Sequence, residues 1–78
     1  LISLTRTLAA EFAKKGIRVN AISPGYIETP LALKNNKDKL DDICQLIPLE
    51  NRFGHAEEIA NAALFLASPM SSYITGIN

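Results

Sequence analysis

The residues best placed to do chemistry lie in one short loop, Ser23 to Thr29. Pro24 fixes its own φ and offers no amide donor, and Gly25 lets the backbone pass close to another group or adopt a positive φ. Thr29 adds a hydroxyl four residues beyond that glycine. A Pro-Gly pair by itself indicates only a turn, but beside a hydroxyl it could equally let backbone amides reach a planar polar ligand. Both interpretations are open at this point.

The loop follows a segment with the features of a buried strand. Ile17 to Ile22 is short, β-branched and apolar, and it lies between a glycine and the Pro24-Gly25 pair. Apolar residues recur at helical spacing before and after it, so the expected order is helix, strand, loop, helix, helix. This order predicts an α/β fold with a parallel sheet covered on both faces, in which ligands bind at the carboxyl ends of strands. Asn20 is expected to make a structural hydrogen bond.

Helical spacing predicts the elements around this strand. Leu1 to Lys15 has an apolar arc roughly 180° wide, so this helix is either buried within its own domain or partly in contact with another subunit. Leu31 to Ile47 begins polar and becomes amphipathic, with Leu40, Ile43, Cys44 and Ile47 on one face. Ala56 to Ser68 forms the last helix, which Pro69 ends.

The length of the chain limits what it can do alone. A chain of 78 residues is near the lower limit for a domain that builds its own core. A single parallel strand would also leave its backbone groups without partners beneath the helices. The chain begins inside a helical pattern and ends at Gly76-Ile77-Asn78 as another extended segment starts. We therefore expect residues 1–78 to be one partial domain, truncated at both ends.

Composition argues against several classes of protein. The net charge is zero and charges of both signs are interspersed, so no nucleic-acid partner is expected. No apolar run is long enough to span a membrane. The lone Cys44 excludes an internal disulfide and fits a reducing compartment, so we expect a cytoplasmic location. Cys44 is interpreted as a small core residue, and His55, at a helix entrance, as a surface or capping group.

Several segments resemble the short-chain dehydrogenases/reductases. They are the stretch from Ser3 to Pro30 with its Arg-Val-Asn-x-x-x-Pro-Gly pattern, Arg52-Phe-Gly54, Glu57-Glu58-Ile59-Ala60, Phe65-Leu66-Ala67-Ser68 and Ser71-Ser-Tyr-Ile-Thr-Gly76. The resemblance covers essentially the whole chain, which is similar to 3-oxoacyl-(acyl-carrier-protein) reductases and sugar dehydrogenases. It implies the C-terminal fragment of a Rossmann-like, doubly wound parallel-sheet domain that binds NAD or NADP. The implied reaction interconverts an alcohol and a carbonyl by hydride transfer.

The resemblance also implies which residues contact the cofactor. Pro24 and Gly25 would turn the chain at the nicotinamide, and the backbone of Ile27 would meet the carboxamide. The hydroxyl of Thr29 would bond to the carboxamide or to a phosphate. Tyr26 would line the pocket. No metal ligand is assigned.

No catalytic residue is assigned within the chain. In the family, a tyrosine transfers the proton and a lysine four residues later lowers its pKa; both would lie just before Leu1. Tyr26 and Tyr73 do not fit this pattern, because Pro30 and Ile77 stand where the lysine is needed. The 78-residue chain alone is therefore expected to be inactive.

Two functions fit these residues. In the first, the chain is part of an oxidoreductase and supplies the nicotinamide-side loop and a lid, Leu31 to Ile47, that selects a small-molecule alcohol or carbonyl substrate. The resemblance implies a homodimer or homotetramer for such an enzyme. In the second, the chain is a non-catalytic fragment that acts only in packing or subunit association. A Tyr-x-x-x-Lys motif just upstream of Leu1 would favour the first.

Overall fold

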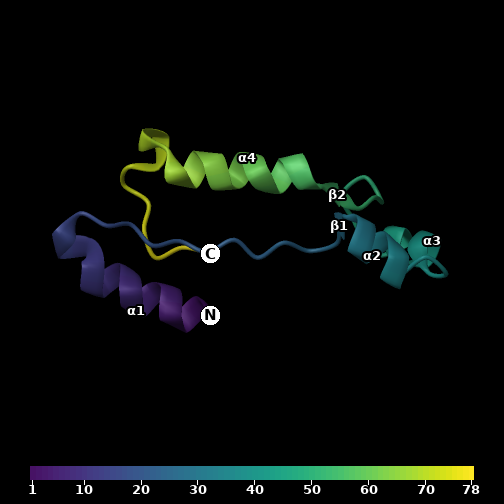
Figure 1. The fold of residues 1–78 in the computed structure, drawn as a ribbon, viewed down its shortest axis with the longest axis horizontal. Helices are drawn as coiled ribbons and strands as arrows, with labels where there is room; N and C mark the ends of the chain where they lie inside the picture. The colour runs from purple at the N-terminus through teal and green to yellow at the C-terminus, as the bar shows by residue number, and fades with distance from the viewer. The chain divides into compact units, whose positions relative to one another are not determined.

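A computed structural model describes all 78 residues, which form helices and a pair of short strands (Figure 1). The chain forms two compact units, one of Leu1–Ser23 with Asn61–Asn78 and the other of Pro24–Ala60. Helix α4 (Ala56–Ala67) begins in the second unit and ends in the first, and it matches the predicted last helix. None of the helices combines the length and the apolar character that crossing a membrane requires.

The first unit begins with helix α1 (Ile2–Phe12), which a 3₁₀ turn (Ala13–Lys15) continues. Gly16 ends this turn in the left-handed region at φ 74°, a conformation that glycine adopts without steric cost. The predicted helix over Leu1 to Lys15 is therefore confirmed. Lys15 lies with its Nζ 5.5 Å from the centre of the Phe12 ring, which adds a cation–π contact at the end of the helix.

The predicted strand Ile17 to Ile22 is extended but not a regular buried strand. Ile17 is 48% exposed and the next five residues are only half-buried. Its main-chain partners come from the last residues of the chain: the N–H of Gly76 donates to the C=O of Val19 (2.7 Å), and that of Ala21 donates to the C=O of Ile77 (2.9 Å). The end of the chain is thus the only neighbour of this segment, and it pairs irregularly. The other edge of the segment has no partner, so the segment forms no continuous ladder and is not fully buried.

Asn20 adds side-chain hydrogen bonds to the same residues at the end of the chain. Its Oδ1 accepts from the N–H of Ile77 (3.2 Å), and its Nδ2 donates to the C=O of Ile74 (3.0 Å). Asn20 thus makes the structural hydrogen bonds that its position in the sequence predicts.

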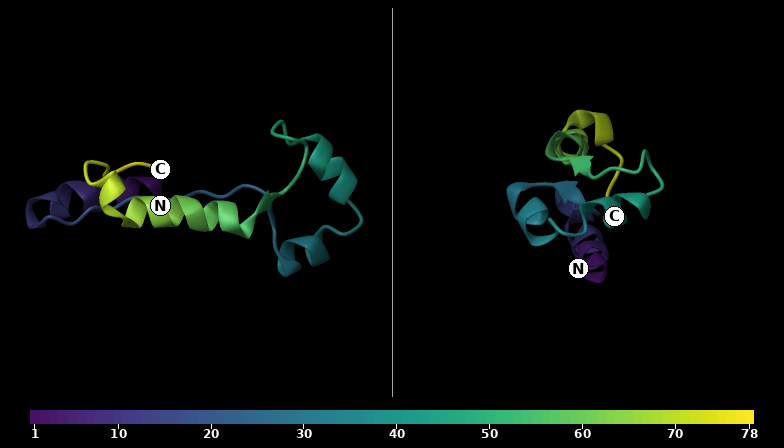
Figure 2. Two further views of the ribbon diagram at one scale, coloured as in Figure 1. Left: turned by 90° about the horizontal axis from the view of Figure 1, so that it is seen from above. Right: turned by 90° about the vertical axis from the view of Figure 1, so that its right-hand side faces the viewer.

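The second unit contains the strands, β1 (Ile27–Glu28) and β2 (Gly54–His55), which pair in parallel with Ile27 opposite Gly54. Between them lie two short helices, α2 (Pro30–Asn35) and α3 (Leu40–Gln45), drawn in teal in Figure 2. The strand pair was not predicted, because two residues are too few for a periodicity to show. The parallel pairing and the helices agree with the predicted α/β class.

Helix α2 was not predicted as a separate element, since Leu31 to Ile47 was expected to begin polar and become a single amphipathic helix. Thr29 occupies its N-cap, where Oγ1 accepts from the N–H of Ala32 (3.1 Å), and Pro30 occupies the first helical position. A threonine followed by proline is a known helix-start signal, so the sequence did contain the information.

Helix α3 confirms the expected amphipathic face, because Leu40, Ile43, Cys44 and Ile47 are all half-buried. The chain after it turns through Glu50 and Asn51, both in the left-handed region at φ 57° and 51°. Asn51 stabilises this turn by donating from Nδ2 to the C=O of Ile47 (3.0 Å). Non-glycine residues adopt this region at a steric cost, which the local hydrogen bond offsets.

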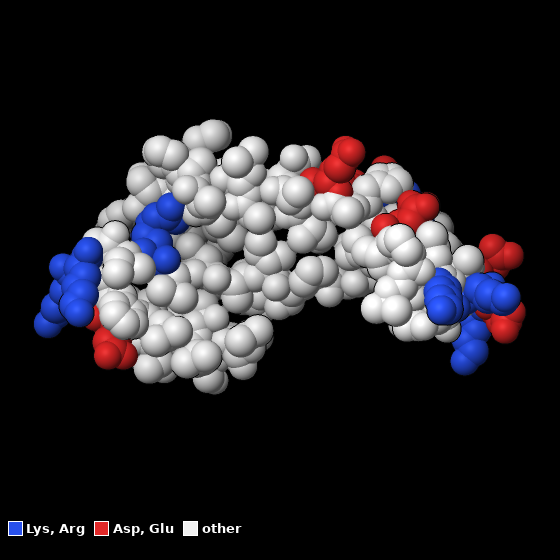
Figure 3. All heavy atoms as spheres, viewed as in Figure 1, with Lys and Arg blue, Asp and Glu red and all other residues white.

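The apolar core within each unit is small. Ala9 is 4% exposed in the first and Phe53 is 6% exposed in the second, and these are the only fully buried apolar residues. Many large apolar side chains of the helices are exposed, including Leu1, Leu4, Leu64 and Met70. Figure 3 shows white atoms over most of the face in view, with blue and red atoms interspersed and no continuous field of one sign.

Candidate functional site

All five residues predicted to contact a cofactor line one cavity in the second unit. Its volume is about 470 Å³, and its walls are Pro24, Gly25, Tyr26, Ile27, Thr29, Ala32, Ala56 and Ile59. Small-molecule sites commonly measure roughly 300 to 1,000 Å³ and are mostly apolar, with few polar groups that fix orientation. The cavity has this character, because its side chains are apolar except at Tyr26 and Thr29.

The backbone of Ile27, one of the residues that line the cavity, has polar groups that the strand pairing does not use. The N–H of Gly54 donates to the C=O of Tyr26 (2.9 Å). In the Ile27–Gly54 pair, Gly54 is therefore the residue whose N–H and C=O point towards the other strand, β1. In a parallel ladder the opposite residue then directs its own N–H and C=O away from that strand. Ile27 thus presents an unpaired donor and an unpaired acceptor side by side.

Thr29 contributes a hydroxyl next to these groups. Its oxygen is already used, since it accepts from the N–H of Ala32 as the cap of helix α2. The hydroxyl hydrogen is not used within the chain and can donate to a ligand. Because the cap fixes the side-chain rotamer, the position of this hydroxyl oxygen is set before anything binds, and its hydrogen can rotate towards a ligand.

Gly25 and Tyr26 complete the loop. Of the two possibilities that the sequence left open for Gly25, a positive φ is not adopted, and a Cβ placed there meets no atom within 4 Å. Another group can therefore approach the backbone of Gly25 closely. Tyr26 is half-exposed, and its ring packs on buried Phe53 with centroids 5.4 Å apart at 40°.

A charged cluster behind the loop was missed in the sequence. Arg52 binds both carboxylate oxygens of Glu58, from Nη1 at 3.0 Å and Nη2 at 2.8 Å, and its Nε donates to Glu50 at 2.6 Å. Glu58 also accepts from the N–H of His55 (2.7 Å). The sequence did indicate the bond between Glu58 and the N–H of His55, because a glutamate three residues after a helix N-cap commonly accepts from the N-cap N–H.

His55 and Glu28 face each other across the strand pair. Nδ1 of His55 lies 3.3 Å from Oε2 of Glu28, and both side chains are at least half-exposed. His55 therefore occupies the helix entrance as a surface group, as expected, and Glu28 is a solvent-exposed charge beside it.

These contacts alter the acidity of Glu58. The hydrogen bonds from Arg52, and next from the N–H of His55, lower the pKa of Glu58 from 4.5 to about 2, and the same pairing raises the pKa of Arg52. The unfolded carboxyl takes up its proton near pH 4.5, whereas the folded one resists until about pH 2. This contribution to stability is therefore present above pH 4.5 and is lost as the pH falls towards 2.

We expect the full-length protein to lose stability between pH 4.5 and 2 more steeply than its Glu58→Gln variant, which lacks this carboxyl. Because the pair is solvent-exposed, the difference should be small and should shrink as salt is added. Urea unfolding followed by circular dichroism at several pH values measures it. Parallel pH profiles for the two proteins would contradict the expectation.

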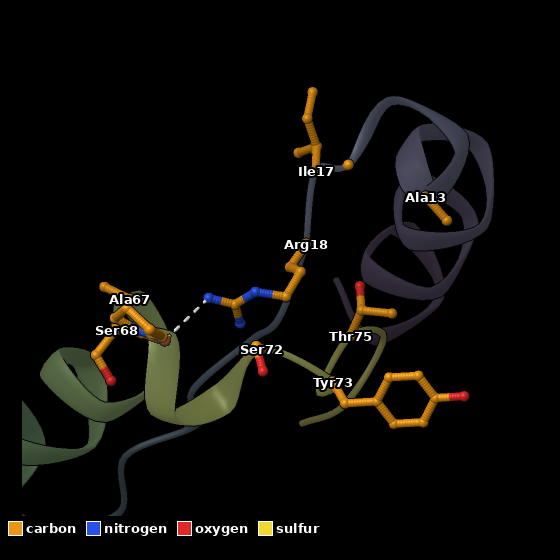
Figure 4. Close-up of a pocket in the computed structure, with 10 residues that line it drawn as sticks. Ala13, Ile17, Arg18, Ala67, Ser68, Ser72, Tyr73 and Thr75 are labelled. Carbon is orange, nitrogen blue, oxygen red and sulfur yellow. Dashed lines mark hydrogen bonds between the residues drawn. The ribbon is translucent and has the colours of Figure 1, made fainter.

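A larger cavity, of about 700 Å³, lies in the first unit and has a different character. Its only charged lining residue is Arg18, which Figure 4 shows reaching from the extended segment towards Ser68. Arg18 donates from Nη1 to Oγ of Ser71 (2.9 Å) and to the C=O of Ile74 (3.3 Å), and from Nη2 to the C=O of Ser68 (3.3 Å). Its guanidinium is thus committed to holding the chain together, and Tyr73 points away from it (Figure 4).

Comparison with known proteins adds to this geometry. A family model described as enoyl-(acyl carrier protein) reductase matches residues 1–78. The chain is 49% identical over 76 residues to a 3-oxoacyl-(acyl-carrier-protein) reductase of Thermotoga maritima, covering 97% of this chain and 30% of the relative. It is also 49% identical over 75 residues to a galactitol 2-dehydrogenase of Cereibacter sphaeroides, covering 94% of this chain and 29% of that enzyme.

Solved structures agree. The chain matches the crystal structure of a dehydrogenase with a TM-score of 0.90 at 44% identity, covering 97% of this chain and 32% of that one. It matches a short-chain dehydrogenase/reductase family protein with a TM-score of 0.85 at 49% identity, covering 97% and 30%. These likenesses confirm the predicted α/β class. The chain spans about 30% of the length of the Thermotoga relative.

Proposed function

Since the chain belongs to the short-chain dehydrogenase/reductase family, we propose that it is the C-terminal part of the Rossmann-like domain of an NAD(P)(H)-dependent oxidoreductase that interconverts an alcohol and a carbonyl. The observation that carries the proposal is the cavity in which Pro24, Gly25, Tyr26, Ile27 and Thr29 meet. When bound, the nicotinamide cofactor supplies or accepts the hydride. The residues of this chain bind the ring and orient it.

The residues present fit a nicotinamide carboxamide. A carboxamide carries a donor and an acceptor side by side, and the backbone of Ile27 offers an acceptor and a donor in the same arrangement. Thr29 adds one further donor, for the carboxamide or a phosphate. Gly25 has open space around it, so a flat ring can approach the backbone closely. Apolar walls from Pro24 and Ile59 suit the faces of the ring.

The segment Leu31 to Ile47 is proposed to be the substrate lid. Its first helix, α2, starts at Thr29 and contributes Ala32 to the same cavity, so a movement of the lid is linked directly to the pocket wall. Closure of such a lid excludes water from the site. The substrate is proposed to be a small-molecule alcohol or carbonyl, and the lid residues would select it.

Proton transfer is proposed to depend on a tyrosine and a lysine outside the 78 residues, so the chain alone would not turn over NAD(P)H. The whole enzyme is proposed to be a cytoplasmic homodimer or homotetramer. The exposed apolar side chains of α1 and α4 are available to pack against further protein, and the free thiol of Cys44 suits a reducing compartment.

Thr29→Val tests the proposed site in the full-length enzyme. It removes the donor to the cofactor, so we expect the dissociation constant for NAD(P)H to rise about tenfold. Thr29→Ser keeps both the hydroxyl and the helix cap and should bind within about twofold of wild type. Fluorescence titration with NADH and NADPH gives the constants.

Thr7→Val is the matched control, since it removes an exposed hydroxyl of α1 that bonds only to the C=O of Ser3. Thermal melts of all the variants separate loss of binding from loss of the α2 cap. A Thr29→Val enzyme that binds both cofactors as tightly as wild type would show that this cavity is not the nicotinamide site.

A further inference from the structure

The pairing that orients Ile27 is too short to be stable by itself. Strands β1 and β2 contain two residues each, and the N–H of Gly54 makes a 2.9 Å bond to the C=O of Tyr26. An isolated two-stranded pair is marginal in water even when it is longer. The direction of the Ile27 backbone groups therefore depends on whatever holds β2 in place.

One ion pair anchors the backbone on both sides of Gly54. On one side, Nη1 of Arg52 donates to the C=O of Phe53 (3.0 Å). On the other, Oε2 of Glu58 accepts from the N–H of His55 (2.7 Å). Arg52 and Glu58 are themselves joined by two parallel hydrogen bonds, a geometry that fixes orientation as well as distance. Gly54 is thus held between two anchored neighbours.

This pair lies behind the loop. Arg52 and Glu58 line a separate cavity of about 360 Å³ that also borders Gly25, Tyr26 and Ile27, and neither residue lines the 470 Å³ cavity. Gly25, Tyr26 and Ile27 border both cavities and form a wall shared by them. A ligand in the larger cavity would therefore contact the wall, while the ion pair would act only through the wall.

We propose that Arg52 and Glu58 are positioning residues for the nicotinamide carboxamide. They hold β2 in register, and through Gly54 they set the direction of the N–H and C=O of Ile27. This inference rests on the proposed function and adds a cause for the geometry of the site. Because only the carboxamide meets Ile27, the loss of either residue should weaken binding at that end of the cofactor and leave its other contacts unchanged.

The test compares two cofactors that differ at this group. In the acetylpyridine analogue of NAD(P), a methyl group replaces the carboxamide NH₂, so the analogue cannot donate to the C=O of Ile27. Calorimetry gives both dissociation constants for the full-length enzyme. We expect wild type to bind the natural cofactor about tenfold more tightly than the analogue. In Glu58→Gln and Arg52→Gln the ratio of the two dissociation constants should fall to about two or less. The C=O of Ile27 would then no longer be held in the direction of the carboxamide.

Glu57→Gln is the matched control, since Glu57 lies in the same first turn of α4 and makes no bond to β2; it should keep the wild-type ratio. If wild type prefers the natural cofactor and both variants keep that preference, the positioning role is wrong and the proposed site stands. If wild type binds both cofactors equally, the contact at Ile27 is wrong and the inference falls with it. Thermal melts identify a variant that fails to fold, and the other variant then decides.

Discussion

Gly54→Ala should lower kcat/KM for the cofactor about 10²-fold in the full-length enzyme, although it adds only a methyl group outside the cavity. A Cβ at Gly54 would lie 2.9 Å from Cδ1 of Ile27, well inside the ordinary carbon–carbon contact of about 3.5 to 4.0 Å. The side chain of Ile27, which lines the proposed nicotinamide site, must therefore shift by roughly 1 Å. The cost to unfolding free energy should be only about 1 kcal/mol, because the end of a flexible side chain moves and the backbone does not.

The double variant Gly54→Ala/Ile27→Val decides whether this contact is the cause. Valine lacks Cδ1, so the clash disappears while the backbone groups of Ile27 remain. We expect the double variant to regain most of the lost kcat/KM, and Ile27→Val alone to stay within a few-fold of wild type. Steady-state kinetics with varied cofactor measures all four proteins. A double variant as impaired as Gly54→Ala would mean that the alanine acts by another route.

Arg18→Met should destabilise the full-length protein by about 3 kcal/mol. The guanidinium bonds to Ser68, Ser71 and Ile74, and Ser71 is 1% exposed, so its hydroxyl would have no water to replace the lost partner. Methionine keeps the apolar stem, which confines the change to these hydrogen bonds. Chemical unfolding measures the loss.

Arg6→Met is the control for Arg18→Met, because Arg6 is an exposed arginine of α1 with no hydrogen-bonding partner in the chain. It should change stability by less than about 0.5 kcal/mol. If Arg18→Met is no more harmful than Arg6→Met, the hydrogen bonds of Arg18 are not what ties the extended segment to the end of the chain.

The sequence predicted those helices that have a clear apolar periodicity and a residue that ends a helix. The helices over Leu1 to Lys15 and Ala56 to Ser68 have long apolar stripes, with Gly16 and Pro69 at their ends. The site loop could be located because parallel-sheet folds bind ligands where a strand ends. In each case the information is local, so a single sequence carries it.

What could not be predicted depends on contacts between distant residues. The register of Ile27 with Gly54 joins segments on either side of α2 and α3, and no spacing rule connects them. Burial of Ile17 to Ile22 was overestimated because periodicity reports which residues can be covered, not whether the cover lies in the same chain. Helix α2 is different: its Thr-Pro start was visible, but the polar residues after it outweighed that signal.

The sparse core of each unit has a consequence for handling the polypeptide. Thirteen large apolar side chains are at least 40% exposed, on a chain whose net charge is zero and whose isoelectric point is about 6.8. Near neutral pH such molecules have almost no net electrostatic repulsion between them, and their exposed apolar surface favours association. Expressed on their own, these 78 residues would self-associate and precipitate, and their colloidal behaviour would be governed by whatever protein covers those helices.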